Sequence, residues 1–282
     1  MDRLEAHRKF FADLITTTAG VPKGPLNAAF VATPRERFVG PGPWKVFAGG
    51  GYITTPTDDP AFLYQDITVA LSESDKINNG QPVLHAVCLA MLNPREGDTV
   101  VHIGAGTGYY TALLAHLTGP TGQVHAYEIN TALAERAAAN LSDLQQVIVH
   151  AQSAAEGTLP SANLIYVNAG ATAPLEIWLD ALRPSGKLLF PLTPDGPGGT
   201  PGAGAMLLVT RTPTEKFDAR FIMPVMFIPC AGARDDETAK KLAEAFKRGD
   251  MQSVRSLRRH TPPDETSWCA GRGWWLSTAE NT

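Results

Sequence analysis

VVHIGAGTGYYTALLA, residues 100–115, is the stretch that decides the fold of this chain. A run rich in β-branched residues ends at Ile103, a glycine-rich turn follows at 104–108, and helix-forming residues continue to Ala115. Glycine suits such a turn because the backbone bends sharply and must approach a ligand closely, with no Cβ in the way. The stretch therefore predicts a strand, a ligand-binding turn and a helix in succession.

Strand-like and helix-like segments continue to alternate after this stretch. Short β-rich runs lie at 123–128, 146–150, 163–168 and 187–191, and helical segments at 109–117, 131–141 and 174–182. This alternation is typical of a parallel sheet covered by helices. Two further runs, 206–211 and 219–228, are interpreted as an antiparallel edge pair. We predict an α/β fold with a doubly wound, mostly parallel sheet of about seven strands.

The composition of the chain divides it into three segments. Residues 1–32 are expected to form an N-terminal helical segment, 33–230 the catalytic domain, and 231–282 an appended C-terminal helical region. Within the catalytic domain, 33–66 is rich in Gly and Pro and is expected to form a long ordered loop or lid.

The C-terminal segment is predicted to contain two helices, at 235–248 and 251–259. Three tryptophans follow, at positions 268, 274 and 275. They could pack the tail onto the domain, which is the favoured interpretation, or form a contact with a partner or a second copy of the chain.

The charge balance excludes a broad nucleic-acid surface. The chain carries 24 basic and 28 acidic residues, for a net charge of −4. One local basic cluster, formed by Arg255, Arg258, Arg259 and His260, is expected to be a solvated helix end.

Cysteine usage and hydropathy indicate the compartment. The three cysteines lie far apart without metal-ligand spacing, so we expect neither a metal site nor a disulfide framework. No apolar run approaches the roughly 18 residues of a spanning helix, and the N-terminus lacks the apolar core of a secretory signal. The prediction is a soluble cytoplasmic protein with no membrane partner.

The glycine spacing distinguishes two classes of ligand. A dinucleotide fingerprint needs glycines at relative positions one, three and six. Counted from Gly104, position six is Tyr109, and the third glycine comes one place earlier, at Gly108. This favours S-adenosylmethionine as the cofactor. The residues predicted to hold it in this turn are Gly104, Ala105, Gly106, Thr107, Gly108 and Tyr109.

An acid at the end of the next strand completes the predicted cofactor site. Glu128 follows Gly108 by 20 residues (128 − 108), where a carboxylate can accept both ribose hydroxyls. Its neighbour Ile129 is included in the predicted site. Gln152 and Ser153, after the third strand, are candidates for the adenine edge and equally ordinary loop residues. Asn168 ends the fourth strand, at the sheet edge where ligands bind, and is also included.

Five segments of the chain share their pattern with one family of enzymes. They are PRERFV at 34–39, GQPVLHAVCLAML at 80–92, IGAGTGYYTALLA at 103–115, AYE at 126–128 and LRPSGKLLFPL at 182–192. Over these residues the chain resembles the protein-L-isoaspartate O-methyltransferase family. The resemblance implies a class I adenosylmethionine-dependent methyltransferase, Rossmann-like in fold, whose methyl acceptor is a side-chain carboxylate of a protein or peptide.

Carboxylate methylation makes modest demands on the protein. A carboxylate is already a nucleophile at neutral pH, so no strong general base is needed. The reaction depends on alignment with the sulfonium methyl, on desolvation and on a restrained approach distance. The lack of an obvious catalytic triad in this sequence agrees with that chemistry.

The chain departs from the family pattern at two positions. The family has a Ser or Thr two places before the proline of the Gln-Pro segment, where this chain has Gly80. Its polar role could pass to Asn79 or Gln81, whose amides can donate hydrogen bonds. His85 matches a family histidine that faces the active site, and it could orient the acceptor or be a core histidine. The family's acidic adenine contact is replaced by Gln152.

These observations leave several hypotheses open. The first is a carboxyl O-methyltransferase acting on isoaspartyl or other protein carboxylates, which in the family supports protein repair. The second keeps the chemistry and changes the acceptor to a dedicated peptide or a small molecule. The third is a catalytically weak adenosylmethionine-binding adaptor that recruits a partner through 231–282. The fourth is a dinucleotide oxidoreductase.

Overall fold

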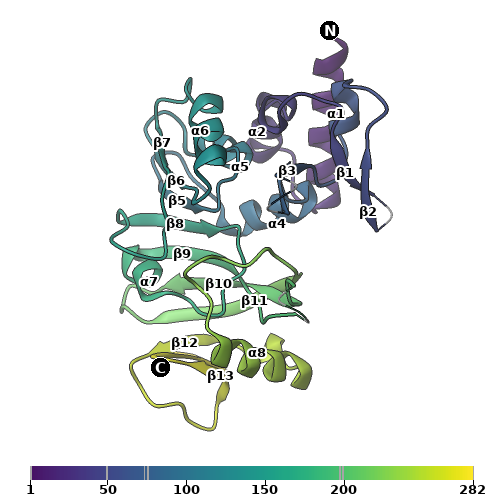
Figure 1. The fold of residues 1–282 in the computed structure, drawn as a ribbon. Helices are drawn as coiled ribbons and strands as arrows, with labels where there is room; N and C mark the ends of the chain where they lie inside the picture. Colours follow the sequence, from purple (N-terminus) through teal and green to yellow (C-terminus); the bar gives the residue numbers. More distant parts are fainter. Residues whose placement is uncertain are drawn as a thin grey trace. The chain divides into compact units, whose positions relative to one another are not determined.

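A computed structural model describes residues 2–48, 50–72, 74, 76–196, 198 and 200–281. The chain forms two compact units, coloured along the sequence in Figure 1. The first contains Met1–Asp98 and Ala105–Gln152, and the second contains Thr99–Gly104 and Ser153–Thr282. The boundaries of these units differ from those of the three segments expected from composition. The three segments remain a prediction.

The first unit is mainly helical. Its helices are α1 (Arg3–Thr18), α2 (Pro25–Ala32), α3 (Glu36–Val39), α4 (Pro82–Leu92), α5 (Tyr109–Thr118) and α6 (Thr131–Asn140). Helices α2 and α4 each begin at a proline. Proline suits the first helical position because an N–H there would have no acceptor within the helix, so no hydrogen bond is lost. Phe11, Phe30, Leu89 and Leu113 are fully or almost fully buried and form part of the core of this unit.

The segment 33–66, expected to be a lid, contains regular structure. Strands β1 (Lys45–Ala48) and β2 (Gly51–Thr54) form an antiparallel hairpin, and a 3-10 helix, η1, covers Pro60–Leu63. A second antiparallel pair, β3 (Ala70–Ser72) and β4 (Ile77–Asn78), leads into α4. The hairpins bring the chain to the start of α4, where the acceptor-site residues were predicted.

The predicted strand–helix–strand rhythm is confirmed in the first unit. Strand β6 (Gln123–Tyr127) leads through α6 to β7 (Val147–His150), and the two strands pair in parallel. Helix α6 begins after Asn130, whose side chain accepts a hydrogen bond from the Leu133 N–H at 3.1 Å. This N-cap starts the helix immediately after Glu128 and Ile129.

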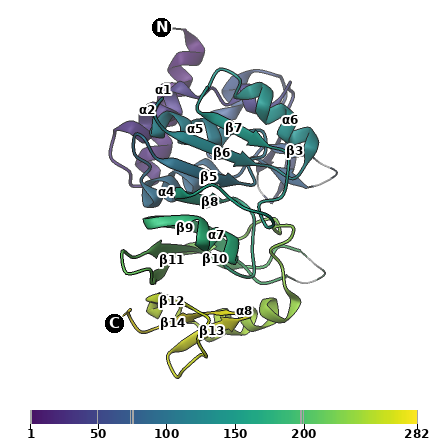
Figure 2. The ribbon, with the colours of Figure 1, turned by 90° about the vertical axis from the view of Figure 1, so that its left-hand side faces the viewer.

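The second unit is built on one large sheet (Figures 1 and 2). Its described strands are hydrogen-bonded in the order β13-β14-β12-β11-β10-β9-β8-β5. They comprise β5 (Thr99–Ile103), β8 (Ala162–Val167), β9 (Leu182–Leu192), β10 (Gly204–Arg211), β11 (Phe217–Val225), β12 (Ser256–Arg259), β13 (Ser267–Gly271) and β14 (Trp274–Ser277). Strands β5, β8 and β9 are parallel, as predicted, and helix α7 (Glu176–Ala181) connects β8 with β9. The remaining pairs are antiparallel.

The C-terminal region is only partly helical, which corrects the prediction for 231–282. Helix α8 (Asp236–Arg248) is confirmed. The second predicted helix is wrong: Met251–Ser253 forms a short 3-10 helix, η3, and Ser256–Arg259 forms strand β12. Each of the four β12 residues faces a residue of β14, and this tertiary pairing overrides the local helical pattern. The basic cluster therefore lies on and around a strand instead of at a helix end.

The C-terminal tryptophans pack the tail against the rest of the second unit. Trp268, Trp274 and Trp275 are 5%, 5% and 1% exposed. Trp268 makes edge contacts with Phe221 and Phe246, at centroid distances of 5.1 and 5.2 Å. Helix α8 contacts β13, and Figure 2 shows the two side by side. The buried rings explain why this short strand pair is stable at the end of the sheet.

A buried arginine connects the segments of the first unit. Arg35, in the PRERFV segment, is completely buried, and its guanidinium donates hydrogen bonds to the carbonyl oxygens of Leu63, Gln65 and Ile67. The Gln65 and Ile67 bonds are 2.9 and 2.8 Å long. The guanidinium also lies 5.4 Å from the centroid of the Phe11 ring. One side chain thus fixes the loop that leads to α4.

Replacing Arg35 with methionine should destabilise the protein strongly. The variant keeps the apolar stem but removes three charge-assisted hydrogen bonds, so we expect the free energy of unfolding to fall by about 3 kcal/mol. Urea unfolding measures the change. Arg37→Met in the same segment is the control, because Arg37 pairs with Asp143 at the surface and should cost less than about 1 kcal/mol. Equal losses in the two variants would contradict the role given to Arg35.

Candidate functional site

The glycine turn between β5 and α5 adopts a conformation that needs its glycines. Gly104, Gly106 and Gly108 have φ values of 74°, 57° and 95°, in the left-handed region that side chains disfavour. A Cβ on Gly108 would also lie 2.7 Å from the Leu141 Cδ1 atom. Both the backbone angle and the packing therefore exclude larger residues at this position.

Glu128 binds the glycine turn directly. Its carboxylate accepts hydrogen bonds from the Gly106 N–H at 2.7 Å and from the Asn130 N–H at 2.9 Å. The Ala105 N–H donates to the Tyr127 carbonyl at 3.1 Å, so turn and strand end are joined at two adjacent places. Glu128 is 6% exposed, and burial raises its pKa above the usual value, although the backbone N–H donors act in the opposite direction.

Two predicted site residues belong to the second unit and lie together there. A Cβ on Gly104 would lie 3.4 Å from the Asn168 carbonyl carbon, so the chain passes close to the end of β8. The Asn168 amide is 2.7 Å from His102 Nε2. Burial lowers the pKa of His102 to about 3, so this ring is neutral and its Nε2 accepts the amide hydrogen. Among the described residues, the Asn168 Oδ1 atom is a buried acceptor without a donor.

The other predicted cofactor residues differ in their surroundings. The Tyr109 ring is buried against Phe38 and Tyr110, so its side chain belongs to the core. Thr107 is buried, and its carbonyl accepts from Asn140 Nδ2 at 3.0 Å. Ile129 is 57% exposed and offers an apolar surface directly beside Glu128.

The two candidates for the adenine edge also differ. Gln152 is exposed in the first unit. Ser153 begins the second unit, and its hydroxyl accepts from the Ala155 N–H at 3.1 Å. Their role toward a cofactor stays a prediction.

His85 fills the space beside Gly80. A Cβ on Gly80 would lie 2.1 Å from His85 Nε2, a separation that no atom pair tolerates, and the φ of Gly80 is 71°. The His85 ring is 2% exposed and stacks on Tyr110, with centroids 3.6 Å apart and planes at 14°. The Tyr110 hydroxyl in turn donates to the Gly80 carbonyl at 3.3 Å. Gly80, His85 and Tyr110 therefore form one packed cluster.

The two amides that could replace a hydroxyl at position 80 have different partners. The Gln81 amide donates to Asp66 Oδ2 at 2.7 Å, and Asp66 Oδ1 accepts the Val83 N–H at the start of α4. Asn79 Oδ1 accepts the Val69 N–H at 2.7 Å. Its Nδ2 is buried and has no acceptor among the described residues. Asn79 is therefore the amide with a donor to offer, while Gln81 is held by Asp66.

Sequence reasoning missed the role of Tyr110 in this site and, for Asp66, which it considered for the acceptor side or for packing of the lid, the two partners. Tyr110 was treated only as part of a helix, although it carries the His85 ring and binds the Gly80 carbonyl. Asp66 fixes both Gln81 and the first turn of α4. The sequence did contain a signal for Tyr110. Tyr109 and Tyr110 are adjacent at the start of a helix, so their side chains point in different directions and contact different neighbours. No signal in the sequence pairs Asp66 with Gln81.

The described part of the chain also limits other kinds of site. It contains no group of three or more His, Cys, Asp or Glu side chains that could hold a metal ion. None of its helices combines the length and the hydropathy required to cross a membrane.

Comparison with known proteins identifies the class. A solved structure named protein-L-isoaspartate O-methyltransferase superposes with a TM-score of 0.65 at 19% identity, covering 89% of this chain and 72% of that one. A Plasmodium falciparum beta-aspartate methyltransferase in complex with S-adenosyl-L-homocysteine gives 0.61 at 16% identity, covering 80% of this chain and 98% of that one. The fold is therefore that of a class I adenosylmethionine-dependent methyltransferase, as predicted.

Sequence comparison narrows the class to one family. The model of the protein-L-isoaspartate(D-aspartate) O-methyltransferase family matches residues 51–235. A protein-L-isoaspartate O-methyltransferase of Methylorubrum extorquens is 30% identical over 231 residues, which cover 81% of this chain and 89% of that protein. One of Aeropyrum pernix is 28% identical over 186 residues, 64% and 68% of the two chains. The chain belongs to the protein-L-isoaspartate O-methyltransferase family and is an S-adenosylmethionine-dependent carboxyl methyltransferase.

The Gly80–His85 contact predicts a strong coupling between the two positions. Gly80→Ser should destabilise the protein by more than about 2 kcal/mol, because a Cβ there strains the backbone and collides with the imidazole. In a His85→Ala background only the backbone strain remains, at about 1 kcal/mol. Urea unfolding of the four proteins in the cycle measures the coupling. Strictly additive losses would show that His85 does not occupy this space in solution.

Proposed function

We propose that this enzyme methylates isoaspartyl carboxylates of proteins and peptides, with Asn79 taking over the polar role of the family's missing hydroxyl. The observation that carries the proposal is the buried Asn79 Nδ2, which has no acceptor among the described residues. A buried donor without a partner costs about 1–3 kcal/mol, and an acceptor carboxylate would supply the partner. Membership of the family supports the choice of acceptor.

The cofactor is assigned to the glycine turn and to Glu128. S-adenosylmethionine supplies an electrophilic methyl group when it is bound. When the cofactor is bound, the carboxylate of Glu128 would accept its ribose hydroxyls, and the exposed Ile129 side chain would supply apolar surface beside them. Asn168, in the second unit, stays a predicted cofactor residue, and among the described residues its Oδ1 is a buried acceptor without a donor. The donor set of this chain therefore fits the cofactor.

The acceptor side has to hold a carboxylate without a base. Asn79 is fixed by its contact with Val69, so its Nδ2 donor has a defined direction. One amide hydrogen bond orients a carboxylate oxygen and leaves the other oxygen to attack the methyl carbon. The His85 ring fills the space beside Gly80 and stacks on Tyr110, so water has no room in the packing next to Asn79. Alignment and desolvation are the two contributions that this reaction needs.

A dedicated acceptor is the second candidate function. Gly80 and the buried His85 ring give the cluster a shape different from one built around a Ser or Thr at position 80. A change of shape beside the acceptor supports a narrower choice of peptide. The two candidates differ in what they predict for a generic isoaspartyl peptide, which only the first expects to be methylated.

Cofactor affinity should depend on the ionisation of Glu128. Because burial raises the pKa of Glu128 above 4.5, the carboxylate becomes protonated earlier than usual as the pH falls, and affinity is lost in the mildly acidic range. Calorimetry with S-adenosylhomocysteine measures this loss. Glu128→Gln should bind roughly tenfold to hundredfold more weakly at neutral pH and show no such pH dependence.

Glu135→Gln is the matched control for this experiment. Glu135 is an exposed residue of α6, and its replacement changes the net charge by the same amount. The control should keep the affinity and the pH dependence of the unmodified protein. A Glu128→Gln variant that binds with unchanged affinity would remove Glu128 from the cofactor site.

Methyl transfer to peptides tests the acceptor and the role of Asn79 together. Labelled methyl from S-adenosylmethionine should reach an isoaspartyl peptide and not the matched aspartyl peptide. Asn79→Asp keeps the oxygen that binds Val69 but replaces the donor with a negative oxygen, so we expect kcat/KM to fall about a hundredfold. Binding of S-adenosylhomocysteine should stay unchanged.

Asn78→Asp provides the control for Asn79→Asp. It places the same charge one residue away and keeps the oxygen that accepts the Gly80 N–H. The control should retain kcat/KM within about threefold. Equal labelling of the two peptides would contradict the isoaspartyl acceptor, whereas equal losses in the two variants would contradict only the role of Asn79.

A further inference from the structure

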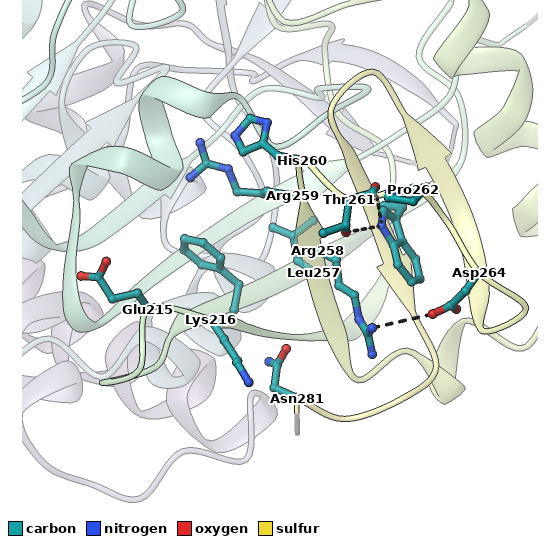
Figure 3. Close-up of a pocket in the computed structure, with 12 residues that line it drawn as sticks. Glu215, Lys216, Leu257, Arg258, Arg259, His260, Thr261, Pro262, Asp264 and Asn281 are labelled. Carbon is teal, nitrogen blue, oxygen red and sulfur yellow. Dashed lines mark hydrogen bonds and ion pairs between the residues drawn. The ribbon is translucent and has the colours of Figure 1, made fainter.

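The second unit contains a basic pocket at its C-terminal strands (Figure 3). Its volume is about 590 Å³, which is large enough for several residues of a peptide. Most of its lining comes from Leu257 to Asn281, beyond the segment 51–235 that matches the family model. The pocket therefore lies mostly outside the residues that match the family model.

The charges around this pocket favour an anion. Lys216, Arg258, Arg259 and His260 line it, against two acids, Glu215 and Asp264. The chain as a whole has a net charge of −4, so the excess of Lys and Arg over acids in this lining is a local exception. A local excess of positive charge attracts acidic ligands and orients them during approach.

Arg258 is held in place for such a ligand. Its guanidinium lies 5.0 Å from the centroid of Trp275, whose indole N–H donates to the Thr261 carbonyl at 3.1 Å. Its contact with the Asp264 carboxylate is long, at 3.7 Å. Figure 3 shows the Lys216 and Arg258 side chains pointing in the same direction, toward the end where Asn281 lies. A planar guanidinium fixed in this way pairs readily with a carboxylate.

Arg259 has a different role at the other end. It donates to Asp180 at 2.7 Å and lies over the Phe217 ring, so it contributes positive charge while being held by the protein. The His260 contact with Glu176 is looser, at 3.6 Å between exposed side chains. Because its carboxylate contact is long, Arg258 is better placed than Arg259 to bind an added anion.

The strand beside the pocket has a partly unpaired edge. Strand β14 pairs with all four residues of β12. Within the part of the chain that the structure describes, β11 pairs with Ser256 and Leu257 but does not extend to Arg258 and Arg259. An edge of this kind accepts an extended peptide by strand addition, with side chains reaching the neighbouring pocket.

We propose that this pocket binds an extended acidic peptide segment of a partner protein. Its backbone lies along β12 beside Arg258 and Arg259, and its carboxylates pair with Arg258 and Lys216. The proposal concerns binding alone and does not depend on the identity of the methyl acceptor.

A nucleic acid fits the same pocket less well. Binding of single strands relies on aromatic faces that stack with bases. Here Trp275 is 1% exposed and Phe217 is 7% exposed, so neither ring offers an open face. The pocket therefore presents cationic side chains and a strand edge, which together suit a peptide.

Fluorescence anisotropy with a labelled peptide tests the proposal. The probe is a short peptide of alternating acidic and β-branched residues, and its control has every acid replaced by the corresponding amide. The full-length protein should bind the acidic probe, with affinity that falls as salt rises, and should not bind the amide control. The Lys216→Gln/Arg258→Gln variant should bind about tenfold more weakly.

Two further variants make the result specific. Lys240→Gln/Lys247→Gln removes two charges from exposed positions of α8 and should bind as the unmodified protein does. Arg258→Lys keeps charge and fold but not the planar fork, so it should lose part of the affinity even if the double variant at the pocket is unstable.

Three results would overturn the proposal. They are failure of the acidic probe to bind at millimolar concentration, equal weakening by the α8 variant, and displacement of the probe by single-stranded RNA at concentrations where polyglutamate of equal charge has no effect.

Discussion

The contact between Glu128 and the Gly106 N–H is the constraint on which the site depends. It joins the end of β6 to the turn that opens α5, and the adjacent Ala105–Tyr127 bond repeats the connection one residue away. Burial alone would favour the neutral acid, and the backbone donors oppose that tendency. The two backbone N–H donors fix the direction of the Glu128 carboxylate. Each oxygen can still accept a further hydrogen bond from a ligand hydroxyl. The glycines are required because the turn must reach the carboxylate without side chains.

Gly80 and the His85 ring occupy one packed space. The imidazole of His85 and a side chain at position 80 compete for the same space, so the protein can contain one or the other. The glycine is also required by its φ of 71°. The cluster is therefore packed, with Tyr110 closing it from the other side of the ring. Position 80 therefore carries no hydroxyl, and the amide of the adjacent Asn79 is a buried donor without an acceptor among the described residues.

Much of the fold could be predicted because its signals are local. The runs that form β5, β6 and β8 and the turn between them carry their periodicity and glycines in the sequence. The spacing from Gly108 to Glu128 likewise predicted the acid that binds the turn. Strand β12 could not be predicted, because its conformation follows from pairing with β14. For the same reason the partners of Asp66 could not be predicted, since they are a side chain and a backbone group distant in sequence.

The C-terminal strands alter the chemistry of the second unit's sheet. They cover the first two β11 residues, which would otherwise stand at an edge, and their own packing comes from buried tryptophans instead of long strand pairing. Strand β12 in turn extends past the start of β11, so that in the part of the chain that the structure describes Arg258 and Arg259 pair with β14 but not with β11. Charged side chains at an edge protect against pairing with apolar strands, because burying them unpaired is costly. The same arginines can pair with the carboxylates of an acidic strand. Arg258 and Arg259 would therefore both protect this edge from apolar strands and select an acidic peptide.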